Sequence, residues 1–327
     1  MLIDCTDQVI EKQGEISKNI TNIKAFAEQA DEPDMAIGSG CNGCGYKDWC
    51  FRALPENNVF DIGWSMWGSK KDEAYNMGLV SFEDVMNAGF KLSERQARQV
   101  ETIVKDLCPH INKPEIRAFL STVKYPLYHF DFETYQQAVP LWDNVSPYQQ
   151  IPFQYSLHIQ NEPCGVTTHK EFLGKEGADP RRTLAERLIL DIPTNSCVMA
   201  YNMGFEKSQI NRLANLFPDL SKHLMSIHEN MIDLMVPFRS GAYYSREMGG
   251  SFSIKKVLPA LFPDDSELDY SSLNIIQNGG DAMNAYATLH EKPVNEIAEI
   301  RAALLAYCRL DTLAMVKILE RLYAITG

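Results

Sequence analysis

From residue 124 to the end of the chain, short apolar runs alternate with longer segments whose apolar residues recur at helical spacing. Short runs rich in aromatic and β-branched residues predict strands, and the longer period predicts amphipathic helices. We expect strands at residues 125–135, 153–160, 167–172 and 197–202, the second and third belonging to a meander. We expect helices at residues 179–190 and 206–216, followed by one long helix or a broken pair at residues 294–325. This alternation predicts a mixed α/β domain over residues 124–327.

The N-terminal part of the chain has a different pattern. Residues 7–30 carry apolar side chains at helical spacing, which predicts an amphipathic helix that needs a partner surface. Glu32 and Pro33 are expected to end that helix, and a Gly/Ser loop follows.

The middle of the chain is predicted to be a helical connecting region, residues 51–123, with short helices near 81–88 and 93–107. The expected organisation is therefore a helix with a cysteine cluster at residues 1–50, the connecting region, and the α/β domain.

Composition and charge favour a globular protein and argue against a membrane-spanning or strongly basic nucleic-acid-coating protein. With 327 residues, 45% hydrophobic and 23% charged, the chain is typical of a globular protein with two domains, or one large domain and an appendage. No apolar run has the length of a membrane span, so we expect a cytoplasmic protein without a membrane partner. The formal net charge of −12 argues against nonspecific coating of nucleic acid by a basic surface. It is compatible with a phosphodiester held in a cleft where bound cations supply the positive charge.

The first candidate site lies in the strand YPLYHFDFETY, which carries Asp131 and Glu133 two positions apart. Residues at i and i+2 of a strand point to one face, while Phe130 and Phe132 face the opposite layer. Two anionic side chains in a buried strand are costly unless a cation lies between them, which points to a divalent metal. The alternative is a strand end that is exposed to water.

Two further segments carry acids at informative positions. Tyr307 and Asp311 are four residues apart on the last predicted helix and therefore share a face, although a helix face with one polar edge has the same spacing. In YNMGFEK, Asn202 ends a strand and Glu206 opens the next helix. The helix dipole alone also favours a carboxylate in a first turn.

Taken in order, these segments resemble the DEDD 3′–5′ exonucleases of the ribonuclease-H-like fold, in the subgroup whose third motif carries a tyrosine. The resemblance covers residues 124–327 and implies a mixed sheet flanked by helices. It further implies two divalent ions, Mg²⁺ or Mn²⁺, acting on single-stranded ends of DNA or RNA. The implied ligands and catalytic residues are Asp131, Glu133, Asp311, with Tyr307 orienting the attacking water and Glu206 in place of the family's second-motif aspartate. Asp233 is the alternative acid for that position.

Residues near these motifs are candidate substrate contacts. Asn202 is one, and Lys255 or Lys256 is suited to meet a substrate phosphate, unless the pair is simply a solvated start of a helix. Arg239, Tyr243 and Tyr244 are expected to line the same cleft, where tyrosines can stack on bases.

The segment CNGCGYKDWC brings Cys41, Cys44 and Cys50 close together in sequence. Clustered thiolates suit one soft metal centre, and a loose turn with incidental cysteines is the alternative. The helix and these spacings resemble the C-terminal end of RecB-like nucleases, in which three clustered cysteines and a distant fourth hold an iron–sulphur cluster. The resemblance implies a 4Fe–4S cluster, with Zn²⁺ bound together with Cys5 as the runner-up. It also leads us to expect that this chain is a C-terminal portion, with an upstream nuclease domain or partner protein outside it.

Three functions follow from these observations. The first is a metal-dependent 3′–5′ exonuclease that hydrolyses phosphodiester bonds by a two-metal mechanism. The alternative is a non-catalytic ribonuclease-H-like module that binds nucleic acid or a protein. A cysteine-based redox or zinc regulator rests on the N-terminal cysteines alone.

Overall fold

Five strands form one mixed sheet at the centre of the C-terminal part of the chain. The computed structural model describes residues 3–31 and 36–327. The strands lie in the order β4-β3-β2-β5-β6, in which β2, β3 and β4 make an antiparallel meander and β5 and β6 run parallel to β2. Their bounds are β2 Leu127–Tyr135, β3 Ile151–Gln160, β4 Thr167–Leu173, β5 Cys197–Ala200 and β6 Met231–Asp233.

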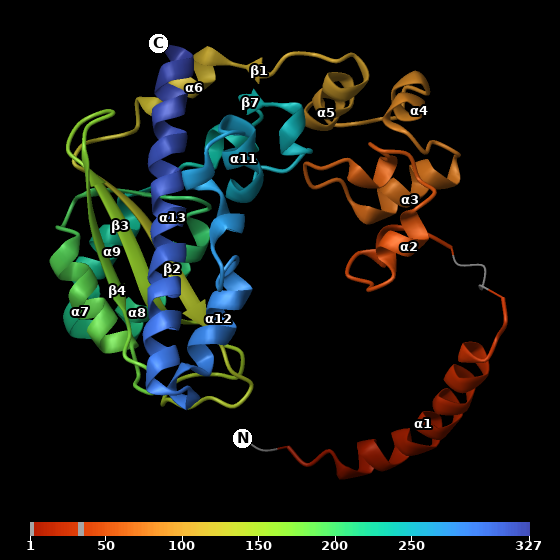
Figure 1. Ribbon diagram of the computed structural model, residues 1–327, viewed down its shortest axis with the longest axis horizontal. Helices are drawn as coiled ribbons and strands as arrows, with labels where there is room; N and C mark the ends of the chain where they lie inside the picture. Colours follow the sequence, from red (N-terminus) through yellow and green to blue (C-terminus); the bar gives the residue numbers. More distant parts are fainter. Residues whose placement is uncertain (1–2, 32–35) are drawn as a thin grey trace.

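Helices cover both faces of the sheet. On one face lies α13, Val294–Thr326, a single helix of 33 residues, together with α12, Gly279–Ala287 (Figure 1). On the other face lie α7 Arg181–Asp191, α8 Gly204–Leu216 and α9 Pro218–Glu229. The expected α/β class, with a mixed sheet flanked by helices, is therefore confirmed.

The alternation of β2 divides its side chains between these two faces. Phe130 and Phe132 are buried in the core formed with α7, α8 and α9. Asp131 and Glu133 point the other way, toward α13, as residues two apart in a strand must. A register irregularity between Glu133 and Thr134 interrupts the pairing of β2 with β3.

Polar contacts fix α13 on the sheet. The Nε2 of Gln154 donates to the carbonyl of Leu304 at 2.8 Å. Eight residues later, the hydroxyl of Thr312 lies 2.7 Å from Ser156 Oγ and 2.8 Å from His158 Nδ1. These groups are buried, and each loses water, so the contacts stabilise one register of the helix over others.

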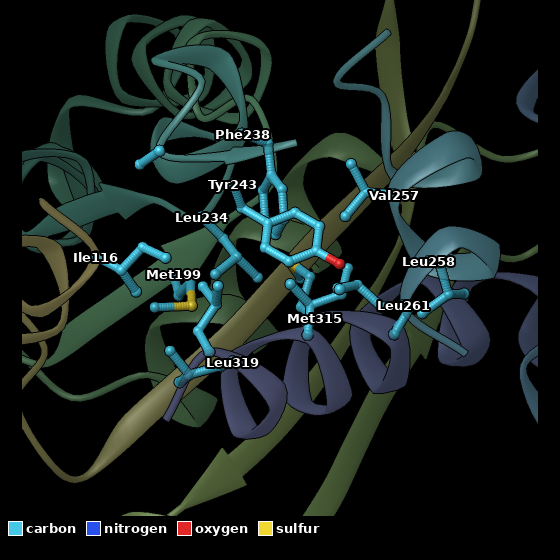
Figure 2. Packing of buried hydrophobic residues seen from close by; sticks show 14 of the residues in the cluster. Ile116, Met199, Leu234, Phe238, Tyr243, Val257, Leu258, Leu261, Met315 and Leu319 are labelled. Atoms are coloured by element: carbon cyan, nitrogen blue, oxygen red, sulfur yellow. The ribbon is translucent and has the colours of Figure 1, made fainter. Parts of the chain in front are cut away.

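Apolar packing completes the attachment of α13 (Figure 2). Met315 and Leu319 of α13 lie in a buried cluster with Val257 and Leu261 of α11. The same cluster includes residues of α6, α10, β5 and β7, so it joins segments that are distant in sequence. The bounds of the additional elements are α6 Lys113–Leu120, α10 Val236–Arg239, α11 Ile254–Leu261 and β7 Tyr243–Tyr244.

The region before the sheet docks onto this domain, and it also has a small core of its own. Strand β1 pairs with β7, and the backbone N–H of Trp64 donates to the carbonyl of Gly250 at 3.0 Å. Gly63 lies so close that a Cβ there would be 2.1 Å from the Gly250 oxygen, so no other residue fits without a shift. The elements of this region are α2 Lys47–Phe51, α3 Gly68–Asn76, α4 Phe82–Asn87, α5 Glu94–Val104 and β1 His110–Ile111.

The N-terminal helix α1 spans Thr6–Ala27, close to the expected range. None of its residues is buried, and within residues 3–31 and 36–327 no surface covers its apolar side. Figure 1 shows α1 extending away from the other helices. The predicted helix end at Glu32 and Pro33 lies outside the described residues. No helix in the described part of the chain combines the length and the apolar character that crossing a bilayer requires.

We expect Leu188→Ala to lower the free energy of unfolding by about 2–5 kcal/mol, because it leaves a cavity between α7 and the sheet. Leu188 has no exposed surface, whereas Leu190 on the same helix is 74% exposed. Leu190→Ala is therefore the matched control and should change the value by less than about 0.5 kcal/mol. Urea denaturation followed by circular dichroism measures both, and equal effects would contradict the described core.

Candidate metal centre

The carboxylates of β2 meet the side chains of one face of α13. The ligand atoms of Asp131, Glu133 and Cys308 all lie within 4.8 Å of one another. The Cys308 thiol is buried and lies 3.8 Å from Asp131 Oδ2. Asp311, one turn further along α13, is near enough for its charge to raise the pKa of both Asp131 and Glu133. A strand and a helix about 180 residues apart in sequence thus bring three acids together.

Burial and mutual repulsion dominate the electrostatics of this cluster. Desolvation is the largest cause that raises the pKa of Asp131 well above its ordinary value, followed by the charges of Asp311, Glu133 and Glu206. The pKa of Glu133 is raised for the same reasons and is lowered in part by Lys255. Desolvation raises the pKa of Asp311 to about 6, although the hydroxyls of Tyr270 and Tyr307 and the charge of Lys255 oppose it.

Glu206 lies in the first turn of α8 and is the fourth acid of the cluster. It is buried, its Oε2 has no hydrogen-bond partner, and desolvation raises its pKa to about 8. Asp233, the alternative acid, is already engaged. Its Oδ1 accepts the backbone N–H groups of Asn202 and Met235 at 2.9 and 3.0 Å, and Arg239 lies 3.4 Å from Oδ2. The structure therefore favours Glu206 over Asp233 as the free carboxylate.

A lysine and two tyrosines lie beside the acids. Lys255 Nζ is 5.4 Å from the ring centroid of Tyr270 and 5.5 Å from that of Tyr307. The hydroxyl of Tyr270 donates to Asp311 Oδ1 at 2.6 Å. Burial and the neighbouring carboxylates raise the pKa of Tyr307, so its hydroxyl stays protonated and can donate. Lys255 is thus held over two aromatic faces next to the carboxylates.

Two other residues that were predicted to contact the substrate, Lys256 and Asn202, are less well placed to do so than Lys255. Lys256 is exposed and follows Lys255 on α11, so it points about 100° away around the helix. Asn202 has a positive φ of 67°, and its backbone N–H donates to Asp233 Oδ1. These features give Asn202 a structural role in the turn before α8.

The expectation that Tyr243 and Tyr244 line the cleft is wrong. Both belong to the buried cluster against α13 and α10, and Tyr244 has no exposed surface. Their aromatic rings stabilise the attachment of β7 and are not available to stack on bases. Arg239 lies near Asp233 and is partly exposed.

The cysteines of the N-terminal region are placed as follows. Cys41 ends the 3₁₀ turn Ser39–Cys41, Cys44 follows in a turn, and Cys50 lies in α2. Sulphurs bound to one Zn²⁺ at about 2.3 Å can be no more than about 4.6 Å apart. The thiols of these three residues do not all come within 4.8 Å of one another, so the described residues contain no preformed zinc site built from them. Cys5 is exposed next to α1. An iron–sulphur cluster is larger than one ion, and that role stays a prediction.

The carboxylate cluster fits a hard divalent cation. Asp131, Glu133, Asp311 and Glu206 supply oxygen donors of the kind that Mg²⁺ and Mn²⁺ prefer. Glu206 keeps a buried oxygen without a hydrogen-bond partner. The positive charge of Lys255 lowers the pKa of Glu133 and of Asp311. The residues present can therefore hold such an ion.

Two residues of the site, Cys308 and Tyr270, were missed by sequence reasoning. Cys308 is three positions before Asp311, so its i, i+3 spacing on the helix could have identified it. Tyr270 opens a short 3₁₀ turn, Tyr270–Ser272, in an irregular segment. Its position follows from tertiary structure, and no local pattern indicates it.

The part of the chain that forms the sheet matches a known family model. Residues 128–253 match the model described as Domain of unknown function (DUF2779). This range includes Asp131, Glu133 and Glu206, whereas Tyr307 and Asp311 lie beyond it. The matched range is less than half of the chain.

Three curated relatives are also described as uncharacterised. The chain is 27% identical over 209 residues to "Uncharacterized protein MG366 homolog" of Mycoplasma pneumoniae, a match that covers 58% of this chain. It is 26% identical over 221 residues to "Uncharacterized protein MG366" of Mycoplasma genitalium and 26% identical over 213 residues to "Uncharacterized protein UU173" of Ureaplasma parvum. The chain spans only 31%, 31% and 30% of the length of these relatives. No solved structure matches the chain.

We expect the metal-free protein to lose stability as the pH rises from about 4.5 to about 8, because the folded state favours protonated Glu206. The group's pKa is raised on folding, so its contribution is complete below the unfolded pKa and is lost as the pH passes the folded one. Glu206→Gln removes this titration. The variant should therefore gain stability relative to the wild type as the pH increases.

Thermal unfolding in a chelator across this pH range tests the expectation. Glu299→Gln, on an exposed position of α13, is the matched control. Parallel curves for wild type and Glu206→Gln would show that Glu206 is not a buried, unpaired acid.

Proposed function

We propose that this chain is a metal-dependent 3′–5′ exonuclease with a ribonuclease-H-like domain. The observation that supports the proposal is the convergence of Asp131, Glu133 and Asp311 from a strand and a distant helix, with Tyr307 and Lys255 beside them. The mixed sheet flanked by helices agrees with the resemblance that suggested this fold. Substrate class and polarity of cleavage come from that resemblance alone.

In this proposal the four acids would hold Mg²⁺ or Mn²⁺ next to the phosphate that is cleaved. When bound, the divalent ions supply positive charge that offsets the clustered carboxylates and stabilises the charge developing on the phosphate. Tyr307 donates its hydroxyl to orient the attacking water. The ammonium of Lys255, held over two rings, faces a non-bridging phosphate oxygen.

The bonds that change follow from this arrangement. The water oxygen forms a bond to the phosphorus that links the last two nucleotides, and the water gives up a proton. The bond from that phosphorus to the O3′ of the preceding nucleotide breaks, and O3′ takes up a proton. A nucleoside 5′-monophosphate leaves, and the shortened strand keeps a 3′-hydroxyl. Repetition from the new end gives exonucleolytic cleavage of single-stranded DNA or RNA.

One observation favours the second candidate, a non-catalytic module that binds nucleic acid or a protein. Glu206 is longer by one methylene than the aspartate that the resemblance expects at this position. A carboxylate displaced in this way weakens one of the two ion positions and lowers the rate. Binding without cleavage would support this candidate.

We expect the purified protein with Mn²⁺ to shorten a 5′-labelled single-stranded oligonucleotide stepwise from its 3′ end. The double variant Asp131→Asn, Asp311→Asn keeps the shapes of both side chains and should reduce the rate by at least about 100-fold, because it removes two metal ligands. Glu320→Gln, nine residues beyond Asp311 on the same helix, is the control and should retain activity. DNA and RNA substrates, each with and without a blocked 3′ end, identify the substrate and the polarity. Equal activity in the double variant would assign the cleavage to another site or to a contaminant.

A calorimetric titration with MnCl₂ tests the metal centre without a substrate. We expect saturable binding by the wild type and by Glu320→Gln, and loss of that binding in the double variant. Manganese binding without cleavage of any oligonucleotide would leave the non-catalytic module as the better description. Absence of binding would remove the basis of both the site and the proposed activity.

A further inference from the structure

A second polar site lies between α7, α8 and the loop that connects β2 to β3. It is a cavity of about 510 Å³, which we call the α7–α8 cavity. Its polar lining consists of Asn144, Gln149, Gln150, Arg181, Arg212 and Asn215. None of these residues belongs to the carboxylate cluster.

Arg181 gives this cavity a fixed, unsatisfied donor. Its side chain is only 7% exposed. Nε and Nη2 donate to both oxygens of Asp179 at 2.6–3.1 Å, and Nη2 also donates to the carbonyl of Asp143 at 3.0 Å. The remaining nitrogen, Nη1, is buried and has no acceptor. A buried guanidinium N–H without a partner is costly, so an acceptor atom supplied by a ligand would stabilise it.

The charge of the cavity favours an anionic ligand. Asp179 offsets the charge of Arg181, whereas Arg212, which also lines the cavity, is exposed and adds a positive charge. A guanidinium group can bind two phosphate oxygens at once. In a chain with a net charge of −12, a cavity that presents two guanidinium groups is a selective place for a phosphate.

The rest of the lining suits a nucleobase. Four side-chain amides line the cavity, and the Oε1 atoms of Gln149 and Gln150 already accept hydrogen bonds from the protein. Asn144 and Asn215 are therefore the amides that can offer a paired donor and acceptor, the geometry with which Asn and Gln bind the edge of adenine. Pro152, Leu213 and Leu216 supply an apolar wall for the flat face of a base. The volume lies in the range of small-molecule sites.

Helix α8 connects the α7–α8 cavity to the carboxylate cluster. Glu206 lies in its first turn and Arg212 near its end, about 9 Å further along the helix axis. Between them, Gln209 donates from Nε2 to Gln150 Oε1 at 3.3 Å, which ties the helix to the cavity wall.

We propose that the α7–α8 cavity binds a nucleoside 5′-phosphate, either as a free nucleotide or as one unit of a strand. Arg181 Nη1 and Arg212 contact the phosphate, and the amides contact the base. Binding here needs neither the divalent ions nor cleavage, so it can be tested independently of the proposed nuclease activity.

The test is a calorimetric titration of the full chain in a chelator with adenosine 5′-monophosphate, an oligodeoxyadenylate and inorganic phosphate. Arg212→Ala and Asn215→Asp change exposed positions, so both variants should fold. We expect each to weaken binding of the nucleotide or the oligonucleotide by at least about tenfold, because a charge-assisted contact is lost or a repulsive charge is added. Arg321→Ala, an exposed arginine on α13, is the charge-matched control and should bind as the wild type does.

The arms of the titration separate the sources of the ligand. Binding of adenosine 5′-monophosphate supports a free nucleotide, and binding of the oligonucleotide alone supports a unit within a strand. The proposal is overturned if neither probe binds, or if both variants bind as the wild type does. It is also overturned if inorganic phosphate binds as tightly as the nucleotide, because the base contacts would then contribute nothing. Loss of nuclease activity in Asp131→Asn, Asp311→Asn with retained nucleotide binding would show that the two sites act separately.

Discussion

The burial of four carboxyl groups close together is the constraint that the rest of this structure must satisfy. Burial is the largest cause that raises the pKa of Asp131, Glu133, Asp311 and Glu206, and the charges of Asp311 and Glu206 raise the pKa of Asp131 and Glu133 further. Such a cluster destabilises an apo protein at neutral pH, so the surrounding elements must hold it by other means. The apolar packing of α13 and the buried core on the opposite face of the sheet supply that stabilisation. A cation between the carboxylates would turn the same repulsion into attraction.

The proposed metal centre and the α7–α8 cavity are built from different residues of the domain. The α13 face of the sheet carries Asp131, Glu133, Asp311, Lys255 and the two tyrosines, the groups for which we propose a metal and a phosphate. The α7–α8 cavity presents guanidinium and amide groups and lies apart from that cluster. Helix α8 contributes Glu206 to the first and Arg212 to the second, so a movement of this helix would affect both.

Much of the sheet domain could be predicted from local pattern. The strands expected at 153–160, 167–172 and 197–202 correspond to β3, β4 and β5, and the choice between one helix and two at the C-terminus is settled by α13. The two-residue spacing of Asp131 and Glu133 also placed them correctly on one face, because a strand has no other geometry. The partner of α1, in contrast, cannot be found among the described residues.

What sequence reasoning missed depends on contacts between distant segments. Residues 51–123 were expected only to connect, yet Trp64 packs into the core of the sheet domain and β1 pairs with β7. Tyr243 and Tyr244 looked suited to stack on bases, and tertiary packing buries them instead. Tyr270 reaches Asp311 from an irregular turn, where no periodicity indicates the direction of a side chain. The cysteine spacing predicted one soft metal centre, and because spacing alone does not fix where sulphur atoms point, an iron–sulphur cluster there stays a prediction.

Two sets of hydrogen bonds attach α13 to strand β3 at two separate points along the helix. Leu304 is held by Gln154 and Thr312 by Ser156 and His158, so the seven residues between them have a fixed rotation and height relative to the sheet. One inserted residue would turn everything beyond it by about 100° and shift it by about 1.5 Å. Tyr307 and Asp311 both lie within this stretch, so homologous chains should vary the apolar side chains of α13 far more readily than its length there.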